Sequence, residues 1–216
     1  MRTALEVLKQ DVTETEGVTV LVTCGDTPLL RAESLAEMMA QHAEQKNVVT
    51  VMTTVVPNPT GYGRILHDGE QIRAIVEEKD ADAEVKKIQE INVGTYCFDL
   101  GFLIAQIDAL DTNNAQGEFY LTDLLKLAYA AGKPTAAYLL ANPDESLGVN
   151  NRVQLARAEK LYRERVNEYW MMQGVTMEDP ASVFIEDKVV LEPDVILEAN
   201  VHLFGHTVIK SGAVIE

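Results

Sequence analysis

One aliphatic residue recurs at every sixth position along the last part of the chain. The series consists of Ile185, Leu191, Leu197, Leu203, Ile209 and Ile215. A strict six-residue period is typical of a parallel β-helix, in which each hexad forms one face of a triangular coil and its aliphatic side chain points to the axis. A plain alternating sheet repeats every second residue and does not require this spacing. We therefore predict that a parallel β-helix begins near Val183.

The residues before the hexads alternate between strand-like and helix-like segments. Strands are expected at 18–24, 48–56, 91–99 and 135–140, helices at 33–44, 119–131 and 151–173, the end of a helix at 3–9, and a hairpin at 64–78 with its turn at Asp68-Gly69. The first two strands are apolar and β-branched, which is typical of strands buried on both faces. This alternation predicts an α/β fold with a mostly parallel sheet.

The charge balance excludes two classes of partner. Lys and Arg number 18 against 34 Asp and Glu, which gives a net charge of −16. A field of that sign repels nucleic acid and anionic membranes, so we expect neither as a partner. No apolar stretch is long enough to span a bilayer. Cys24 and Cys97 belong to no disulfide framework and are expected to be reduced core residues of a cytoplasmic protein. The four histidines are expected at the surface: His42, His67, His202 and His206.

Two segments carry candidate metal ligands. The apolar run 18–24 ends at Cys24-Gly25-Asp26, where ligands of open α/β sheets gather. Gly25 allows close approach of a ligand to the backbone, and Asp26 offers a hard oxygen suited to Mg²⁺. Asn150, just before the helix at 151–173, can offer an amide oxygen to the same ion. Both residues have an alternative interpretation as ordinary turn or helix-capping residues.

Four further segments suit the binding of a polyol ring. Gly61 and Gly63 lie in a Pro/Gly loop, and Glu77 ends a strand where its carboxylate can accept hydrogen bonds from hydroxyls. Asn92 lies in an apolar run, so its amide needs a partner, either core backbone or a ligand. The alternatives are a plain loop and a solvated charge.

The fourth of these segments is "NNAQGEFYLTDLL", which leads into a helix. Glu118, Tyr120 and Thr122 alternate there and share one face if the entry is extended. The alternative is that Thr122 or Asp123 caps the helix. None of these motifs is specific alone, and the sequence contains no GxxxxGK[ST], GxGxxG or HExxH motif.

The order of the segments is far more specific. "GDTPLL", "PTGYGRI", "IVEEKDA", "IQEINVGTYCF", "NNAQGEFYLTD" and "GVNNRVQL", followed by a long helix and hexads, closely resemble the bacterial family of bifunctional N-acetylglucosamine-1-phosphate uridylyltransferase/glucosamine-1-phosphate acetyltransferases. The resemblance implies part of a Rossmann-like nucleotidyltransferase domain at 1–150, a linking helix at 151–174, and the first coils of a left-handed β-helix at 175–216. Members of the family form homotrimers through that β-helix.

The resemblance also implies an activity. The family's first domain converts UTP and N-acetylglucosamine 1-phosphate into UDP-N-acetylglucosamine and pyrophosphate with Mg²⁺. Asp26 and Asn150 match its metal ligands, and Cys24 and Gly25 match neighbouring substrate contacts, Cys24 standing where many members have Tyr. The positions that match amino-sugar contacts are Gly63, Glu77, Asn92, Glu118, Tyr120 and Thr122. The complete enzyme also acetylates glucosamine 1-phosphate with acetyl-CoA, and its product feeds peptidoglycan and lipopolysaccharide synthesis.

Several parts of that family's enzyme have no counterpart in these 216 residues. The glycine-rich phosphate loop, its basic residues and the later acetyltransferase coils are missing, so we expect a middle fragment that is itself inactive or nearly so. Two alternatives stay open: another hexad-tailed sugar-phosphate nucleotidyltransferase, or a non-catalytic module that binds sugar and supports assembly.

Overall fold

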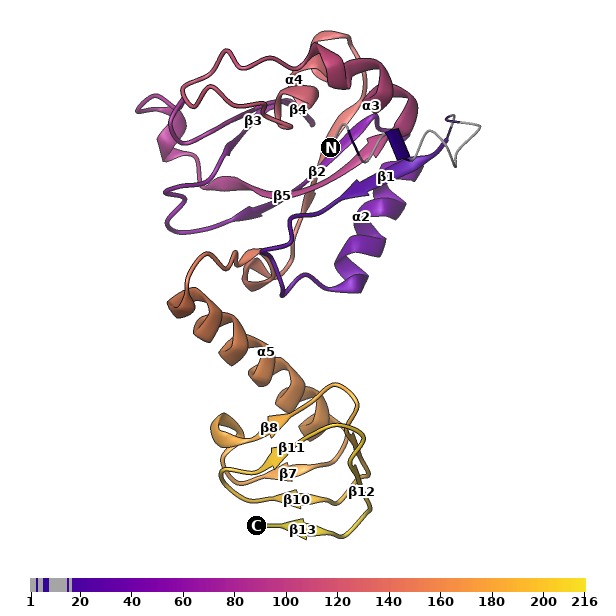
Figure 1. Ribbon diagram of the computed structural model, residues 1–216, viewed down its shortest axis with the longest axis vertical. Coiled ribbons are helices and arrows are strands. Elements are labelled where there is room, and N and C mark those ends of the chain that lie inside the picture. The colour runs from indigo at the N-terminus through magenta and orange to yellow at the C-terminus, as the bar shows by residue number, and fades with distance from the viewer. Residues whose placement is uncertain (1–2, 4–5, 8–14, 16) are drawn as a thin grey trace. The chain divides into compact units, whose positions relative to one another are not determined.

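The computed structural model describes residues 3, 6–7, 15 and 17–216 (Figure 1). The chain divides into two compact units, Met1–Ser146 and Leu147–Glu216. The helix end expected at 3–9 falls largely outside the described residues. The three-part division at residues 150 and 174 stays a prediction. Among the described residues, no helix combines the length and apolar character needed to cross a membrane.

The first unit is an α/β domain. Its strands are β1 (Thr19–Val22), β2 (Val49–Val55), β3 (Arg64–Asp68), β4 (Gln71–Val76), β5 (Glu90–Asp99) and β6 (Thr135–Leu139), and its helices are α2 (Ala32–Glu44), α3 (Leu100–Gln106) and α4 (Asp123–Ala130). Most of these segments lie within a few residues of their expected positions. Two helices differ: α3 was not among the expected helices, and α4 begins only at Asp123 because residues 119–122 lie outside it.

The sheet has the order β4-β3-β5-β2-β6, and β1 pairs with β5. Among the described strands of this sheet, only β2 and β6 pair in parallel, and all other pairs in it are antiparallel. The expectation of a mostly parallel sheet was therefore wrong. The hairpin turn forces β3 and β4 to run antiparallel, and β1, β2 and β3 all run antiparallel to the long strand β5.

Apolar side chains cover both faces of this sheet. On one face, α3 and α4 pack against β2–β5 through a core that includes Leu103, Leu124, Val51 and Phe98. On the other, Met38 of α2 packs with a smaller cluster that includes Cys97 of β5. The strand β5 therefore contributes alternate side chains to two cores, which fixes its register firmly.

Three expectations about burial were wrong. The strand β1 is only half-buried because it pairs, among the described strands, with β5 alone. Cys24 follows β1 and is exposed, although Cys97 is buried as expected. His42 is buried on the inner face of α2, where its Nδ1 lies 2.9 Å from Oγ1 of Thr50, and burial lowers the pKa of its imidazole. The other three histidines are exposed.

The second unit confirms the hexad prediction. The helix α5 (Arg152–Met172) is followed by two-residue strands: β7 (Thr176–Met177), β8 (Phe184–Ile185), β9 (Val190–Leu191), β10 (Ile196–Leu197), β11 (His202–Leu203), β12 (Val208–Ile209) and β13 (Val214–Ile215). Strands one coil apart pair in parallel, β8 with β11, β9 with β12, and β10 with β7 and β13, as the coils of a parallel β-helix do (Figure 1). The hexad aliphatics form a continuous core along the axis.

The helix α5 is attached to these coils by a buried side chain. Asn167 is 1% exposed, and its Nδ2 donates to the carbonyl oxygens of Pro180 (2.7 Å) and Val183 (3.0 Å). Val166 and Trp170 pack against the same axial core. The helix is therefore an integral part of the second unit.

Candidate functional site

Two loops meet over the middle of β5. The strand β1 ends with Val22 opposite Tyr96, and β3 begins with Arg64 opposite Ile91. Between these pairings, the backbone N–H of Asn92 donates to the carbonyl oxygen of Gly63 at 2.9 Å. The loop after β1 and the loop before β3 therefore both face residues 92–96 of β5, which places the segments around Cys24 and Gly63 at one point of the sheet.

At that point β5 contains a bulge. Val51 pairs with Tyr96 and Thr53 with Asn92, so β5 uses two more residues than β2 over the same stretch. Gly94 lies at the centre of the bulge with φ +86°, a conformation that favours glycine. A side chain there would also lie 3.0 Å from Sγ of Cys24, which itself donates to the carbonyl oxygen of Gly94 at 3.4 Å. Bulges redirect side chains, and this one brings Asn92 and Tyr96 together.

Asn92 satisfies its amide within the protein. Its Nδ2 donates to Oη of Tyr96 at 2.7 Å, and its Oδ1 accepts from the backbone amide of Gly94 at 3.0 Å. The core alternative for Asn92 is thus confirmed in part, because both partners come from β5 itself. Each end of the amide still has capacity for one further hydrogen bond, so these contacts leave room for a ligand.

Glu77 is the half-buried carboxylate of the same cluster. Oγ1 of Thr122 donates to its Oε1 at 3.4 Å, and burial raises the pKa of the carboxyl group above its ordinary value. A Cβ at Gly63 would lie 3.2 Å from Oε1 of Glu77 and 2.9 Å from Cγ2 of Ile75. Glycine at position 63 therefore allows the backbone of this loop to pack directly against Ile75 and the carboxylate of Glu77.

Thr122 decides between two hypotheses raised by the sequence. It occupies the residue before α4, but its side chain makes no capping hydrogen bond to that helix. Its hydroxyl contacts Glu77 instead, and the side chain is 6% exposed. The residue therefore connects α4 to the polar cluster at the centre of the sheet.

Tyr120 lies beside this cluster, while Glu118 is less closely attached. Oη of Tyr120 accepts from Nε2 of Gln116 at 2.8 Å, and burial together with the charges of Asp80 and Glu77 raises its pKa. For Glu118, only the backbone is held, by the side chain of Asn114, and the residue is exposed. No described side-chain contact joins Glu118 to Glu77 or Asn92.

Sequence reasoning missed the ion pair that holds the Gly61–Gly63 loop. Arg64 is 1% exposed, and its Nη2 donates to Oε2 of Glu78 at 2.6 Å. The amide of Gly61 donates to the same carboxylate at 3.2 Å, and these two hydrogen bonds, that of Arg64 first, lower the pKa of Glu78. An acidic doublet at a strand end gave no sign that Glu78 pairs with a buried arginine while Glu77 contacts the cluster.

The expected metal ligands offer suitable oxygen donors. Asp26 is exposed in the turn after β1, and among the described contacts its carboxylate forms no hydrogen bond. The cap of α5 is Asn151, whose Oδ1 accepts from the amide of Gln154 at 3.0 Å, so the side chain of Asn150 is not used for capping. A carboxylate and an amide oxygen fit Mg²⁺. No three His, Cys, Asp or Glu side chains converge within the described part of the chain.

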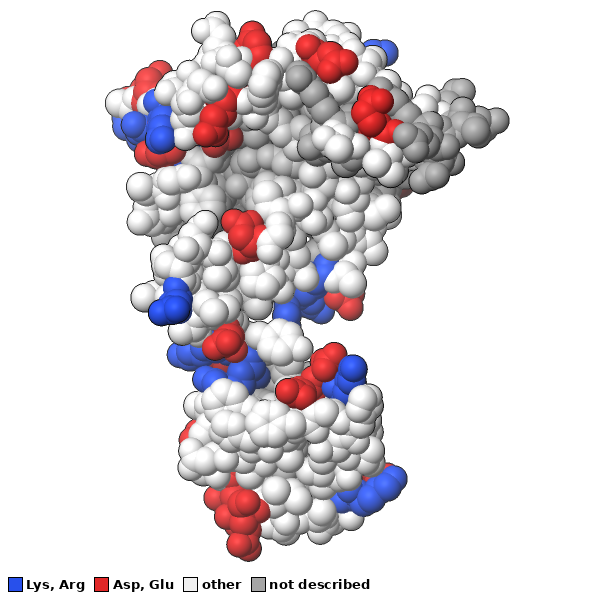
Figure 2. Space-filling view, viewed as in Figure 1, with Lys and Arg blue, Asp and Glu red and all other residues white. Residues whose placement is uncertain are grey.

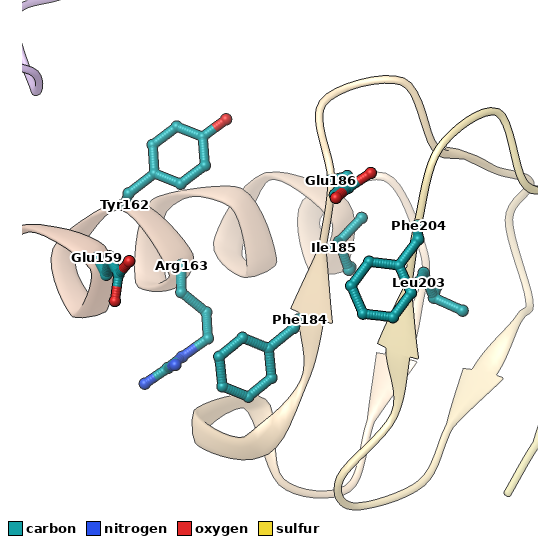
Figure 3. Close-up of a pocket in the computed structure, with 8 residues that line it drawn as sticks. All are labelled: Glu159, Tyr162, Arg163, Phe184, Ile185, Glu186, Leu203 and Phe204. Carbon is teal, nitrogen blue, oxygen red and sulfur yellow. The ribbon is translucent and has the colours of Figure 1, made fainter. Parts of the chain in front are cut away.

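The second unit holds a separate pocket with a volume of ≈ 250 Å³ (Figure 3). Its wall includes Phe184 and Phe204 of the coils and Tyr162 and Arg163 of α5. The guanidinium carbon of Arg163 lies 4.3 Å from the centroid of Phe184, and His202 stacks on the same ring with centroids 4.3 Å apart. None of the site residues expected from the sequence lies in this pocket.

Comparison with known proteins places this geometry in a family. The model of the nucleotidyl transferase family matches residues 2–171. A protein named Bifunctional protein GlmU from Streptococcus equi subsp. zooepidemicus is 46% identical over 214 residues, which cover 98% of this chain and 46% of that protein. GlmU from Syntrophotalea carbinolica is 45% identical over 99% of this chain and 46% of its own length. The chain thus spans about half the length of these curated relatives.

A solved structure shares the fold. A Bacillus anthracis protein described as a glucose-1-phosphate thymidylyltransferase superposes with a TM-score of 0.55 at 20% sequence identity, over 76% of this chain and 61% of that one. At this identity the likeness concerns the fold alone. The family match, the near-complete coverage by GlmU relatives and the sheet described above agree: the chain belongs to the nucleotidyl transferase family.

Proposed function

We propose that this chain forms the sugar-binding part of an enzyme that makes UDP-N-acetylglucosamine from UTP and N-acetylglucosamine 1-phosphate. The observation that carries the proposal is the cluster in which Glu77 contacts Thr122 and packs against Gly63, whose carbonyl oxygen accepts a hydrogen bond from the backbone N–H of Asn92. The similarity to GlmU over nearly the whole chain supports it.

In this proposal the cluster orients the amino sugar. The carboxylate of Glu77 accepts hydrogen bonds from ring hydroxyls, and the amide of Asn92 offers its remaining donor and acceptor. Gly63 allows its loop to lie close to Glu77, because a Cβ at this position would collide with Ile75 and crowd the carboxylate. Tyr120 and Glu118 complete the wall, Cys24 and Gly25 border it after β1, and Asp26 follows them in the same loop.

The reaction needs positioning more than a protein nucleophile. The phosphate of the sugar attacks the α-phosphorus of UTP in line, and pyrophosphate leaves. Asp26 would offer its carboxylate to Mg²⁺, which would neutralise charge on the phosphates, and Asn150 stays the second ligand expected from the sequence. This matters here because the net charge is −16 and acidic side chains are spread over the face of the first unit in Figure 2.

The wider activities are proposals for the complete protein, since the chain covers 46% of its GlmU relatives. They are acetyl transfer from acetyl-CoA to glucosamine 1-phosphate, a homotrimer built on a left-handed β-helix, and a cytoplasmic supply of precursor for peptidoglycan and lipopolysaccharide. We propose neither nucleic acid nor membrane as a partner. The 216 residues contain no glycine-rich phosphate loop, so we expect negligible uridylyltransferase activity from this chain alone. Normal turnover by the 216-residue chain would contradict that expectation.

Calorimetric titration with N-acetylglucosamine 1-phosphate tests the proposed binding. Glu77→Gln keeps the size of the side chain and removes its charge, so we expect affinity to fall at least about tenfold, because hydrogen bonds to charged groups are worth about 1.5–3 kcal/mol. Glu70→Gln, an exposed acid in the β3–β4 turn, is the matched control and should bind as the wild type. Equal affinity of both variants would reject the role of Glu77.

A ligand panel separates the alternatives. We expect tighter binding of N-acetylglucosamine 1-phosphate than of glucose 1-phosphate. The reverse preference would favour another hexad-tailed sugar-phosphate nucleotidyltransferase. Sugar binding by the complete protein without any dependence on Mg²⁺ and without turnover of UTP would favour a non-catalytic module.

A further inference from the structure

The side chain of Tyr96 lies in the candidate site, although the sequence did not single out this residue of β5 as a site residue. Tyr96 is 5% exposed, and its ring stacks on Phe98 with centroids 5.7 Å apart. Its neighbours across the sheet are Val22 of β1 and Val51 of β2. The ring is thus held by the core, while the hydroxyl is directed at Asn92.

The bulge at Gly94 makes this contact possible. In a regular strand, residues four apart on one face lie about 13 Å from each other, too far for a direct hydrogen bond. Here the two additional residues of β5 shorten that path, and Nδ2 of Asn92 reaches Oη of Tyr96 at 2.7 Å. Gly94 supplies both the positive φ and the missing side chain, and its amide fixes the other end of the Asn92 group at 3.0 Å.

These two contacts set the orientation of the amide. The backbone N–H of Gly94 donates to Oδ1, and the hydroxyl oxygen of Tyr96 accepts from Nδ2. Rotating the side-chain amide of Asn92 by 180° would place its NH₂ group against the N–H of Gly94, so only one arrangement of Oδ1 and Nδ2 satisfies both contacts. The remaining N–H and lone pair of Asn92 therefore point in fixed directions. Glu77 lies near enough to Tyr96 for its charge to raise the pKa of the phenol, although burial is the larger cause.

We propose that Tyr96 is a positioning residue for sugar binding: through the Gly94 bulge, its hydroxyl fixes the amide of Asn92 in the orientation that the ligand requires. The proposal rests on the proposed function of this site. It assigns selectivity to a buried phenol that does not itself contact the ligand, and it predicts that Tyr96 acts only through Asn92.

Tyr96→Phe is the test because it removes the hydroxyl and keeps the ring. We expect the dissociation constant of N-acetylglucosamine 1-phosphate to rise about fivefold, the effect of one ordinary hydrogen bond. In an Asn92→Ala background the same change should have no further effect, since the group that Tyr96 positions is gone. Tyr129→Phe is the matched control: that hydroxyl donates to Asp68 in the β3–β4 turn, and its loss should leave binding unchanged.

A measurement without ligand separates this proposal from the proposed function. In the wild type, the side-chain NH₂ resonances of Asn92, assigned by their loss in Asn92→Ala, should show slow exchange with water. In Tyr96→Phe that exchange should become at least about tenfold faster, while Tyr129→Phe leaves it unchanged. These signals decide the role of Tyr96 even if the wild type binds no N-acetylglucosamine 1-phosphate, a result that would reject the proposed function alone. Unchanged Asn92 signals in Tyr96→Phe, or an additive loss of affinity in the double variant, would overturn the proposal.

Discussion

At the scale of single residues, the cluster around Glu77 and Asn92 includes positions that depart from common local rules. Thr122 stands where a helix cap is normally found and contacts Glu77 instead. Gly94 adopts a conformation that other residues reach only at a cost, and the bulge it allows unites Asn92 with Tyr96. Positions that depart from a local structural rule in this way are expected at functional sites.

Glu77 should make binding possible while lowering stability. Burial raises the pKa of its carboxyl group above the ordinary value of 4.5, so the folded protein binds a proton there more tightly than the unfolded chain does. Stability contributed by this residue therefore falls as the pH rises through the interval between the unfolded and the folded pKa. We expect Glu77→Gln to melt at a higher temperature than the wild type at pH 7, with the difference shrinking as the pH falls toward 4. A lower melting temperature of Glu77→Gln at pH 7 would contradict this account, and Glu70→Gln should show no such difference.

Gly94→Ala should be more costly than a comparable change elsewhere. Its φ is +86°, and a Cβ would lie 3.0 Å from Sγ of Cys24, whereas Gly117, with φ +66°, has open space around it. We expect Gly117→Ala to lose about 1–2 kcal/mol of unfolding free energy from backbone strain alone and Gly94→Ala to lose more. Urea denaturation measures both. Adding Cys24→Ala should recover part of the additional loss, and equal losses in the two alanine variants would show that the contact with Cys24 is unimportant.

At the scale of elements, local patterns in the sequence were sufficient for most helices, the hairpin and the hexads. The hexads were predictable because the six-residue spacing of aliphatic residues is a local pattern that indicates burial without knowledge of distant segments. The strand directions were not predictable, because β5 pairs with β1, β2 and β3 and no local pattern encodes these long-range pairings. The same long-range pairing explains why Gly63 and Asn92 were recognisable individually, while Tyr96 and the Arg64–Glu78 pair were not.

The coils of the second unit should depend on their axial side chains. Leu197 is fully buried on the axis, and its neighbour Ile196 is 38% exposed on the outer face. Leu197→Ala should lower the unfolding free energy by about 2–5 kcal/mol, because the cavity cannot collapse in so narrow a core. Ile196→Ala should cost much less. Trp170, the single tryptophan of the chain, packs against this core, so its fluorescence follows the unfolding of this unit. Similar losses from the two substitutions would argue against an axial core.

At the scale of the whole molecule, the candidate sugar site and the β-helix lie in different units. The first carries the polar cluster of Glu77, Asn92 and Thr122 in an α/β sheet, and the second carries α5 and the coils of a β-helix. The net charge of −16 disfavours anions in general, so under the proposed function a phosphorylated sugar would be selected by directed hydrogen bonds and a cation rather than by a positive surface. This is the arrangement that the proposed function requires of the first unit.

The most direct test of the central claim is an NMR titration of the isotope-labelled chain with N-acetylglucosamine 1-phosphate in the presence of Mg²⁺. The account predicts saturable shifts of the backbone amides at Gly63, Glu77, Asn92 and Thr122, with the β-helix coils unaffected. The absence of saturable shifts, or shifts confined to the pocket around Phe184 in the second unit, would contradict the assignment of the sugar site.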